Sequence, residues 1–430
     1  MPVTPPPPES PPPQRPLAED GAAAPSSAEG ILPQTTERLP ATVRALGWTS
    51  FLTDLSSEAI YPLLPGFVIR ELGGSAMNVG MIDGIANGIA AIVRLPSGAI
   101  SDTLGRRPLV LVGYGLSAII RPLMGLATSP LAVLFIRAAD RFGKGIRSAP
   151  RDALVTDLVT PSIRGRAFGH IRAMDHLGAA IGPLLAMAYL FFFPGQERAL
   201  FLLALLPGLV TLAVVARFVK DPPRRDALAM KPILASRLTL PQGMLLSSVA
   251  VWALAASSEQ FLLLRAGDLG TPAWLIPAVW FGVGLCKSAA AKGAGPIVDR
   301  LSPKRALAAG WGLFAIAYGG LSVAGHLAVM LPLLALVAAA YGLIEPAERA
   351  LVANLAPAGR QGSSFGWYTL VQGLMGVPAG LLAGWLWQRG GSGAPVAFAT
   401  TAGLSALAAV FLVLLVHPPR TRQTPLEPGH

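Results

Sequence analysis

The chain has 430 residues, of which 53% are hydrophobic and only 13% are charged, and its formal net charge is +11. This composition excludes an ordinary soluble domain and is typical of a membrane protein. The basic residues do not gather into an aromatic-interleaved patch, so no nucleic acid is expected as a partner, and the single cysteine, Cys286, excludes an intramolecular disulfide and a cysteine-based metal site.

The first forty residues are rich in proline, notably at positions 5–8 and 11–13, and they contain no apolar stretch of the kind that a signal peptide needs. We therefore expect residues 1–40 to form a disordered, polyproline-like cytosolic tail. Proline-rich motifs can also bind partner domains, and the sequence leaves that alternative open.

Twelve apolar segments of membrane-spanning length follow, the first from Val43 to Phe67 and the last from Pro395 to Val416. They form two sets of six, so the predicted fold is an all-α polytopic membrane protein. Its parts are six-helix bundles at residues 41–218 and 242–417, a basic linker at 219–241 and a tail at 418–430. Short loops rich in Lys and Arg fall on the same side as the linker, which places that side and both termini in the cytosol.

The first span carries Asp54 and Glu58, which share a helix face because they lie four residues apart. Two carboxylates in a desolvated interior hold protons more readily than in water, so both are candidates for proton coupling. Equally, they could serve only to neutralise buried cations. On the second span, Asp83 and Arg94 lie three helical turns apart on one face.

The fourth span contains the most basic stretch of the apolar chain, residues 136–152, IRAADRFGKGIRSAPRD. Its cations recur every three or four residues and would form one helical stripe, consisting of Arg137, Arg141, Lys144, Arg147 and Arg151. Charge at bilayer depth needs a partner or a water-filled cavity. We expect the first two cations to pair with the carboxylates of the first span, and the last two to snorkel at a cytosolic helix end.

Asp175 and His176 lie about two turns into the fifth span, where a histidine can titrate near neutral pH or remain neutral and hydrogen-bonded. The second half of the chain has fewer charges inside its spans. The candidate residues there are Glu259 and Glu345.

One loop motif occurs twice: residues 98–107, GAISDTLGRR, recur as residues 295–305, GPIVDRLSPKR. The two glycines and the two aspartates are separated by the same distance in sequence (295 − 98 = 197 and 299 − 102 = 197). A constant offset predicts two copies of one six-helix unit. The candidate gating residues of the two loops are Gly98, Asp102, Gly105, Arg106, Arg107, Gly295, Asp299, Arg300, Lys304 and Arg305.

This repeated G-x-x-x-D-x-x-G-R-R loop resembles the signature loop of the major facilitator superfamily, and the resemblance extends over about residues 43–416. It implies that the loops latch two halves together on the cytosolic side during alternating access. It also implies that the first, fourth, seventh and tenth helices line a central cavity. The second loop has Ser302 in place of Gly105 and Pro303 in place of Arg106, so we expect the first latch to matter more.

Two further motifs resemble those of family members. Arg137-Ala-Ala-Asp140-Arg141 is similar to the R-x-x-Q-G motif of proton-driven transporters, with its last two residues replaced. Gly178-Ala-Ala-Ile-Gly182-Pro183 is similar to the G-x-x-x-G-P helix bend of exporters, although Gly-Pro also kinks helices for purely structural reasons.

The sequence thus predicts a monomeric, multi-pass transporter of the bacterial inner membrane that exports a small organic molecule in exchange for protons, without a cofactor. It lacks a nucleotide-binding loop and a nucleophile–base set, so an enzyme is not expected. One alternative is uptake of an anionic metabolite, motivated by the arginine stripe. Others are metal transport, motivated by His170 and Met174 at helical spacing, and a receptor or lipid-handling protein on the same fold.

Overall fold

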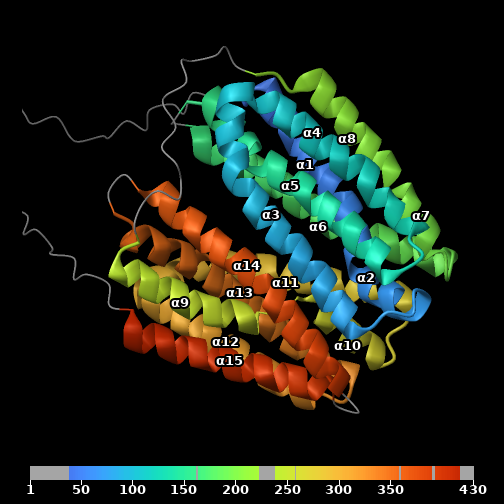
Figure 1. Ribbon diagram of the computed structural model, residues 1–430, viewed down its shortest axis with the longest axis vertical. Coiled ribbons are helices and arrows are strands. Elements are labelled where there is room, and N and C mark those ends of the chain that lie inside the picture. Colours follow the sequence, from blue (N-terminus) through green and yellow to red (C-terminus); the bar gives the residue numbers. More distant parts are fainter. Residues whose placement is uncertain are drawn as a thin grey trace, which may run out of the picture. The chain divides into compact units, whose positions relative to one another are not determined.

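The computed structural model describes residues 38–160, 163–221, 238–256, 258–357, 360–389 and 393–416 (Figure 1). Residues 1–37 of the predicted tail, residues 222–237 of the linker and the C-terminal tail from residue 417 lie outside the described residues. The described chain is almost entirely helical, and the described residues from Leu39 onward belong to one compact unit.

Helices of the N-terminal half begin at strong local signals. The Ser75 side chain accepts a hydrogen bond from the backbone N–H of Asn78 at the start of the second long helix. The Ser129 side chain accepts one from the backbone N–H of Ala132, and Pro130 is the first residue of that helix. A serine N-cap followed by proline satisfies or removes amides that lack a helical partner. The elements are α1 (Ala41–Ile60), η1 (Tyr61–Leu63), α2 (Leu64–Gly66), η2 (Phe67–Glu71), α3 (Ala76–Leu104), α4 (Arg106–Ile120), η3 (Arg121–Leu126), α5 (Pro130–Leu158), α6 (Arg164–Phe192), α7 (Glu197–Leu203) and α8 (Leu205–Phe218).

The C-terminal half begins with a capping box between Thr239 and Gln242. Its elements are α9 (Leu240–Ala255), α10 (Gln260–Asp268), η5 (Ala273–Leu275), α11 (Ile276–Leu301), α12 (Pro303–Val323), α13 (Leu327–Leu355), α14 (Gln361–Arg389) and α15 (Ala394–Leu415). Its core is aromatic: Trp311, Phe314 and Tyr318 on α12 are all at most 1% exposed.

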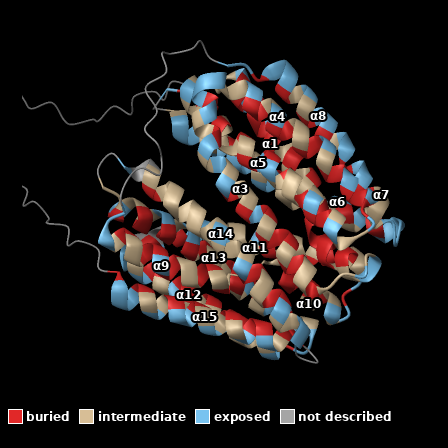
Figure 2. Ribbon diagram, viewed as in Figure 1, coloured by how far each residue is buried: buried red, intermediate tan, exposed pale blue. Residues whose placement is uncertain are grey.

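Ten helical segments of the described residues are long and apolar enough to cross a membrane. Two long helical segments do not belong to that set: residues 41–71 and α5, which carry the charges of the first and fourth predicted spans. Exposed residues lie along the outer faces of the bundle (Figure 2). Many of them are large and apolar, such as Phe192, which is 73% exposed, and Val323, which is 83% exposed. Apolar surface of this extent suits contact with lipid rather than water.

The two halves meet mainly through α3 and α14, which cross at very short range (Figure 1). Gly80 lies directly against Gly380, and a Cβ added at Gly84 would approach the carbonyl oxygen of Gly376 to 2.5 Å. Only glycine allows two helix backbones to approach this closely. Further contacts join α6 to α11 and α2 to α10.

The inter-half contacts lie on one side of the bundle. On α3 they involve residues between Ala76 and Ala91, whereas the end of α3 at Leu104 diverges from the C-terminal half (Figure 1). The diverging side carries the two basic signature loops, and the joined side carries the ring contact between Phe191 and Trp274, whose centroids are 5.4 Å apart. The structure is therefore closed on the side away from the basic loops and open toward them.

Candidate functional site

Two helices are interrupted at the same position of the repeat. α1 ends at Ile60 and continues as a 3₁₀ segment, the short α2 and a π segment, around Pro62 and Pro65, which lack the backbone N–H that a helix needs. In the second half the helix breaks between α9 and α10, and Ser258 in that break corresponds to Tyr61 (258 − 61 = 197). Interrupted membrane helices expose backbone and polar side chains at depth, and in transporters such breaks form binding sites.

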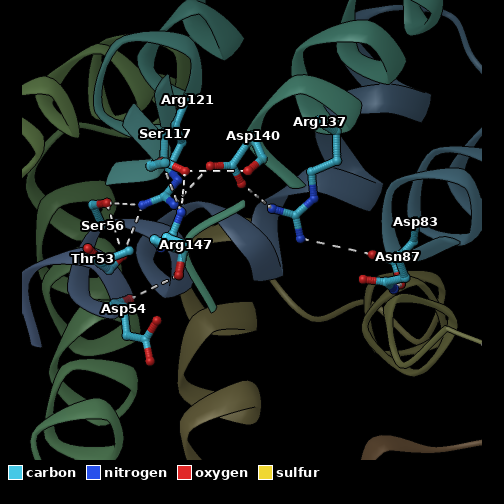
Figure 3. Close-up of polar contacts among 12 residues, drawn as sticks. Thr53, Asp54, Ser56, Asp83, Asn87, Ser117, Arg121, Arg137, Asp140 and Arg147 are labelled. Atoms are coloured by element: carbon cyan, nitrogen blue, oxygen red, sulfur yellow. Dashed lines mark hydrogen bonds and ion pairs between the residues drawn. The ribbon is translucent and has the colours of Figure 1, made fainter. Parts of the chain in front are cut away.

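A chain of buried charges runs from the interface between the halves into the N-terminal bundle (Figure 3). Asp83 on α3 faces Arg137 on α5 at 3.9 Å, and Arg137 lies 3.6 Å from Asp140 one turn later. Asp140 in turn pairs with Arg121 at 3.0 Å. All four side chains are at most 6% exposed, so each charge depends on its neighbours for compensation.

The pairing of Arg137 corrects the sequence prediction, which assigned Arg137 and Arg141 to Asp54 and Glu58. That assignment is wrong because α1 packs chiefly on α6, whereas α5 packs on α3 and α4 and receives its partners from there. Arg137 therefore pairs with Asp83 and Asp140. No ion pair of Arg141 is recorded among the described residues, and its Nε is buried without a hydrogen-bond partner.

Two hydrogen bonds connect carboxylates of the N-terminal half, those of Asp83 and Glu58, to the C-terminal half. Ser258 Oγ donates to Asp83 at 2.7 Å, and Trp280 Nε1 on α11 donates to Glu58 at 2.8 Å. Trp280 also packs on Tyr61, with ring centroids 5.2 Å apart. A hydrogen bond to an ionised acceptor is stronger than a neutral one. The charge state of Glu58 and Asp83 therefore bears directly on how firmly the halves are joined.

The C-terminal half contributes a partly exposed cation to this region. Lys287 on α11 forms an ion pair with Glu259 in the helix break. Its ammonium lies 4.4 Å from the ring centroid of Tyr341 and 5.6 Å from that of Trp280. Glu345, the other candidate of this half, is exposed on α13.

A second polar region is a cavity of ≈ 200 Å³ between α1, α4, α5 and α6. Asp54 lines it, and in Figure 3 its carboxylate points away from Arg137. The charged and titratable side chains that line the cavity are Asp54, Lys144, Arg147, Arg151, Arg172, Asp175 and His176. Taking His176 as neutral, four cations and two carboxylates leave the wall with an excess of positive charge.

The last two cations of the stripe do not snorkel as expected. Arg147 is 6% exposed, donates to Ser117 Oγ at 2.7 Å and lies 4.6 Å from the ring centroid of Tyr114. Arg151 lies 3.9 Å from Asp175. The prediction for both failed because α5 continues to Leu158, which keeps them beside α4 and α6.

Arg94 on α3 pairs with Asp152 at 3.7 Å and lies far along the helix from Asp83.

Sequence reasoning missed Arg121, Trp280, Tyr61 and Tyr341. Arg121 had a usable signal, because it is a lone cation between the apolar runs of residues 108–120 and 122–127. The aromatic residues had none, since a buried tryptophan or tyrosine in a membrane helix is usually a packing residue.

The first signature loop is held entirely within its own half. Arg106 pairs with Asp102 and lies 3.3 Å from Asp157 of α5, and the backbone amide of Arg107 donates to Asp221 at 2.8 Å. Gly98 contributes its carbonyl oxygen to Arg106 at 3.4 Å. No hydrogen bond or ion pair joins this loop to the described residues of the other half, as fits a molecule open on this side.

The second loop repeats the backbone of the first. Gly105 has φ +96° and the corresponding Ser302 has φ +72° (302 − 105 = 197), a conformation that is unfavourable for a non-glycine residue. Lys304 donates to the carbonyl of Val413, much as Arg107 donates to that of Val219. Only the place of Gly295 and Asp299 in α11 is described, and no side-chain hydrogen bond or ion pair of Arg300 or Arg305 is recorded among the described residues.

The glycine motif of α6 acts in packing. Gly178 and Gly182 face α1, where a Cβ added at Gly182 would come within 2.5 Å of the carbonyl oxygen of Leu55. The helix continues without interruption through Pro183. Among the described residues no group of three or more His, Cys, Asp or Glu side chains could hold a metal ion.

Similarity to known transporters extends over nearly the whole chain. The profile of the Major Facilitator Superfamily matches residues 46–380 and, in a second match, residues 266–430. The chain is 30% identical over 364 residues to an uncharacterised MFS-type transporter of Methanocaldococcus jannaschii, covering 83% of this chain and 90% of that protein. It is 27% identical over 355 residues to the multidrug resistance protein MdtH of Salmonella paratyphi C, covering 79% and 85% respectively.

Solved structures share the fold at low sequence identity. A bacterial homologue of the human lysosomal transporter Spinster, in an inward-facing and unoccupied conformation, has a TM-score of 0.69 at 15% identity and covers 87% of this chain and 95% of its own. A D-xylose–proton symporter has a TM-score of 0.68 at 15% identity, covering 88% and 97%. Together with the family profile, these matches show that the chain belongs to the major facilitator superfamily of transporters.

Proposed function

We propose that this protein is a proton-coupled secondary transporter that exports a small organic molecule across the bacterial inner membrane by alternating access. In this proposal twelve spans form two bundles at residues 41–218 and 242–417, with both termini in the cytosol and the two signature loops as gates. The similarity to MdtH supports export, and the solved proton symporter of the same fold supports coupling to protons.

The observation that carries the proposal is the hydrogen bond between Glu58 and Trp280 across the closed side. When Glu58 is ionised, the hydrogen bond from Trp280 is charge-assisted and holds the C-terminal half firmly. When Glu58 is protonated, the same hydrogen bond is weaker. The empty, deprotonated carrier then remains closed on this side. Neutralisation of Glu58 by a proton releases it, which links proton binding to the conformational change.

The test uses a cysteine reporter and needs no known substrate. Ile69 is partly buried and lines a small cavity between α2 and α10 on the closed side, so Ile69→Cys in a Cys286→Ser background should react faster with an impermeant maleimide when that side opens. Labelling should increase as the pH falls. With Glu58→Gln added, labelling should be high and independent of pH.

Glu345→Gln is the matched control, because Glu345 is an exposed glutamate on α13. It should leave the pH dependence intact. If Glu58→Gln retains the pH dependence of the parent, Glu58 is not the proton carrier. Asp54→Asn then tests the second carboxylate of α1 in the same background.

Uptake of an anionic metabolite is the second candidate function. It is favoured by the excess of positive charge along the ≈ 200 Å³ cavity and by Arg141, whose Nε is buried without a hydrogen-bond partner. Metabolite profiling of cells that lack or overproduce the protein distinguishes the two functions. An exporter depletes its substrate from overproducing cells, whereas an importer of an anion enriches it there.

A further inference from the structure

We propose that Glu259, Trp280 and Tyr341 form a binding site for an organic ammonium ion, and that Lys287 occupies this site while the substrate is absent. The proposal rests on the proposed function and specifies its substrate class, a monovalent organic cation. The three residues of this ammonium site come from the α9–α10 break, α11 and α13.

The surroundings of the Lys287 ammonium are those that recognise an alkylammonium ligand. It pairs with the Glu259 carboxylate and lies against two aromatic rings, at 4.4 Å and 5.6 Å from their centroids. Aromatic faces attract cations through their negative quadrupole, most strongly away from water. A carboxylate beside two rings provides both the charge and the shape that an ammonium requires.

The place of this site in the molecule distinguishes it from an ordinary buried ion pair. Glu259 lies in the break of a discontinuous helix, and Trp280 donates its indole hydrogen to Glu58 of the other half. The side chains of Lys287 and Glu259 remain 28% and 19% exposed. A structural ion pair has no need of solvent access, whereas a binding site does.

Lysine suits the role of an occupant that can be displaced. Its ammonium is carried on a flexible four-carbon stem, so it can leave the rings without any movement of α11. Two carboxylates, Glu58 and Glu259, then face the site. A bound organic cation would neutralise them as a proton does, so that proton and substrate compete for the same negative charge. A transporter that exchanges protons for substrate requires this competition.

The first experiment measures binding of tetraphenylphosphonium, a permanent organic cation, to purified protein by isothermal titration calorimetry. Removing the internal competitor by Lys287→Met should raise the affinity at least about tenfold, since the site is no longer occupied for most of the time. Lys287→Arg keeps a cation in place and should bind as weakly as the parent. Glu259→Gln or Trp280→Leu, added to Lys287→Met, should abolish the gain.

Lys292→Met is the matched control, because Lys292 is an exposed lysine on the same helix, α11, and should leave affinity unchanged. A folded Lys287→Met protein that binds no tighter than the parent overturns the proposal. Because this readout is binding, it can fail while proton-dependent labelling of Ile69→Cys succeeds, and the reverse.

A second measurement uses the unmodified chain, in case Lys287→Met does not fold. Saturating tetraphenylphosphonium should drive Lys287 out of the ammonium site and increase its acetylation by an amine-reactive reagent several-fold, as followed by mass spectrometry. Acetylation of Lys304 serves as the internal reference. An unchanged Lys287 rate up to the solubility limit of the probe would also overturn the proposal.

Discussion

Arg137 lies at the centre of the buried charge chain, with Asp83 on one side and Asp140 on the other. Its Nε and Nη2 have no hydrogen-bond partner, and neither has Asp83 Oδ1. A buried pair 3.9 Å apart with free polar atoms on both sides is incompletely satisfied. Such a pair can change partners when the halves move, because little hydrogen bonding is lost.

Arg137→Ala should destabilise the protein by about 3–5 kcal/mol, since it leaves Asp83 buried without its cation. Asp140 keeps Arg121 and should tolerate the loss. Thermal unfolding of the purified variants measures the effect. The double variant Arg137→Leu with Asp83→Leu should recover most of the stability without recovering transport.

Arg94→Ala serves as the control, because Arg94 is half exposed and its pair with Asp152 should contribute under about 1 kcal/mol. If Arg137→Ala is as stable as Arg94→Ala but binds substrate more weakly, Arg137 is a substrate ligand and not a structural partner.

The charge pattern alone predicted which helices have polar interiors, but it could not predict which carboxylate meets which arginine. Asp54, Glu58 and Asp83 all lie on helices that could neighbour α5, and only the packing of α1 on α6 decides between them. The repeat offset was more informative. It relates Gly105 to Ser302, and the structure gives both residues a positive φ. A sequence repeat therefore predicts which residues share a backbone conformation. It does not predict which side chains form ion pairs, because these depend on contacts between residues distant in sequence.

At the scale of elements, the close crossing of α3 and α14 holds the two halves together on the closed side. Gly80, Gly84 and Gly88 lie on one face of α3, and a Cβ added at any of them would meet α14. These contacts exist because the side away from the basic loops is closed. The opposite state requires the two helices to separate here, so the glycines stabilise one state selectively.

Gly80→Ala and Gly380→Ala should therefore shift the protein toward the state that is open on this side. Overpacking at a close contact typically costs about 1–3 kcal/mol, which corresponds to a population change of about 5- to 160-fold. Labelling of Ile69→Cys measures the shift. Gly312→Ala on α12 is the control, since a Cβ there meets nothing within 4 Å. An equal response to that variant would mean that the α3–α14 crossing does not set the balance between the two states.

For the whole molecule, closure of the basic side must bring the ends of α5 and α13 together, since alternating access exchanges which side is open. Asp152 and Arg349 occupy equivalent repeat positions with opposite charge (349 − 152 = 197). Asp152 is 36% exposed at its side chain, and Arg349 is exposed. Among the described residues of this open state, Asp152 pairs with Arg94 at 3.7 Å and with Arg151 at 3.2 Å, and both arginines belong to its own half.

We predict that Asp152 and Arg349 pair when this side closes. Asp152→Asn and Arg349→Gln should each lower the closed population about two- to fivefold, as expected for a partly exposed pair worth about 0.2–1 kcal/mol. The double variant should do no more harm than either single one. Spin labels on cysteines placed at Thr156 and Asn354, in a Cys286→Ser background, report the separation of the two helix ends.

Asp157→Asn is the control, because the Asp157 carboxylate pairs with Arg106, and it should combine additively with Arg349→Gln. Additive losses for Asp152 and Arg349 themselves would mean that the two side chains never meet.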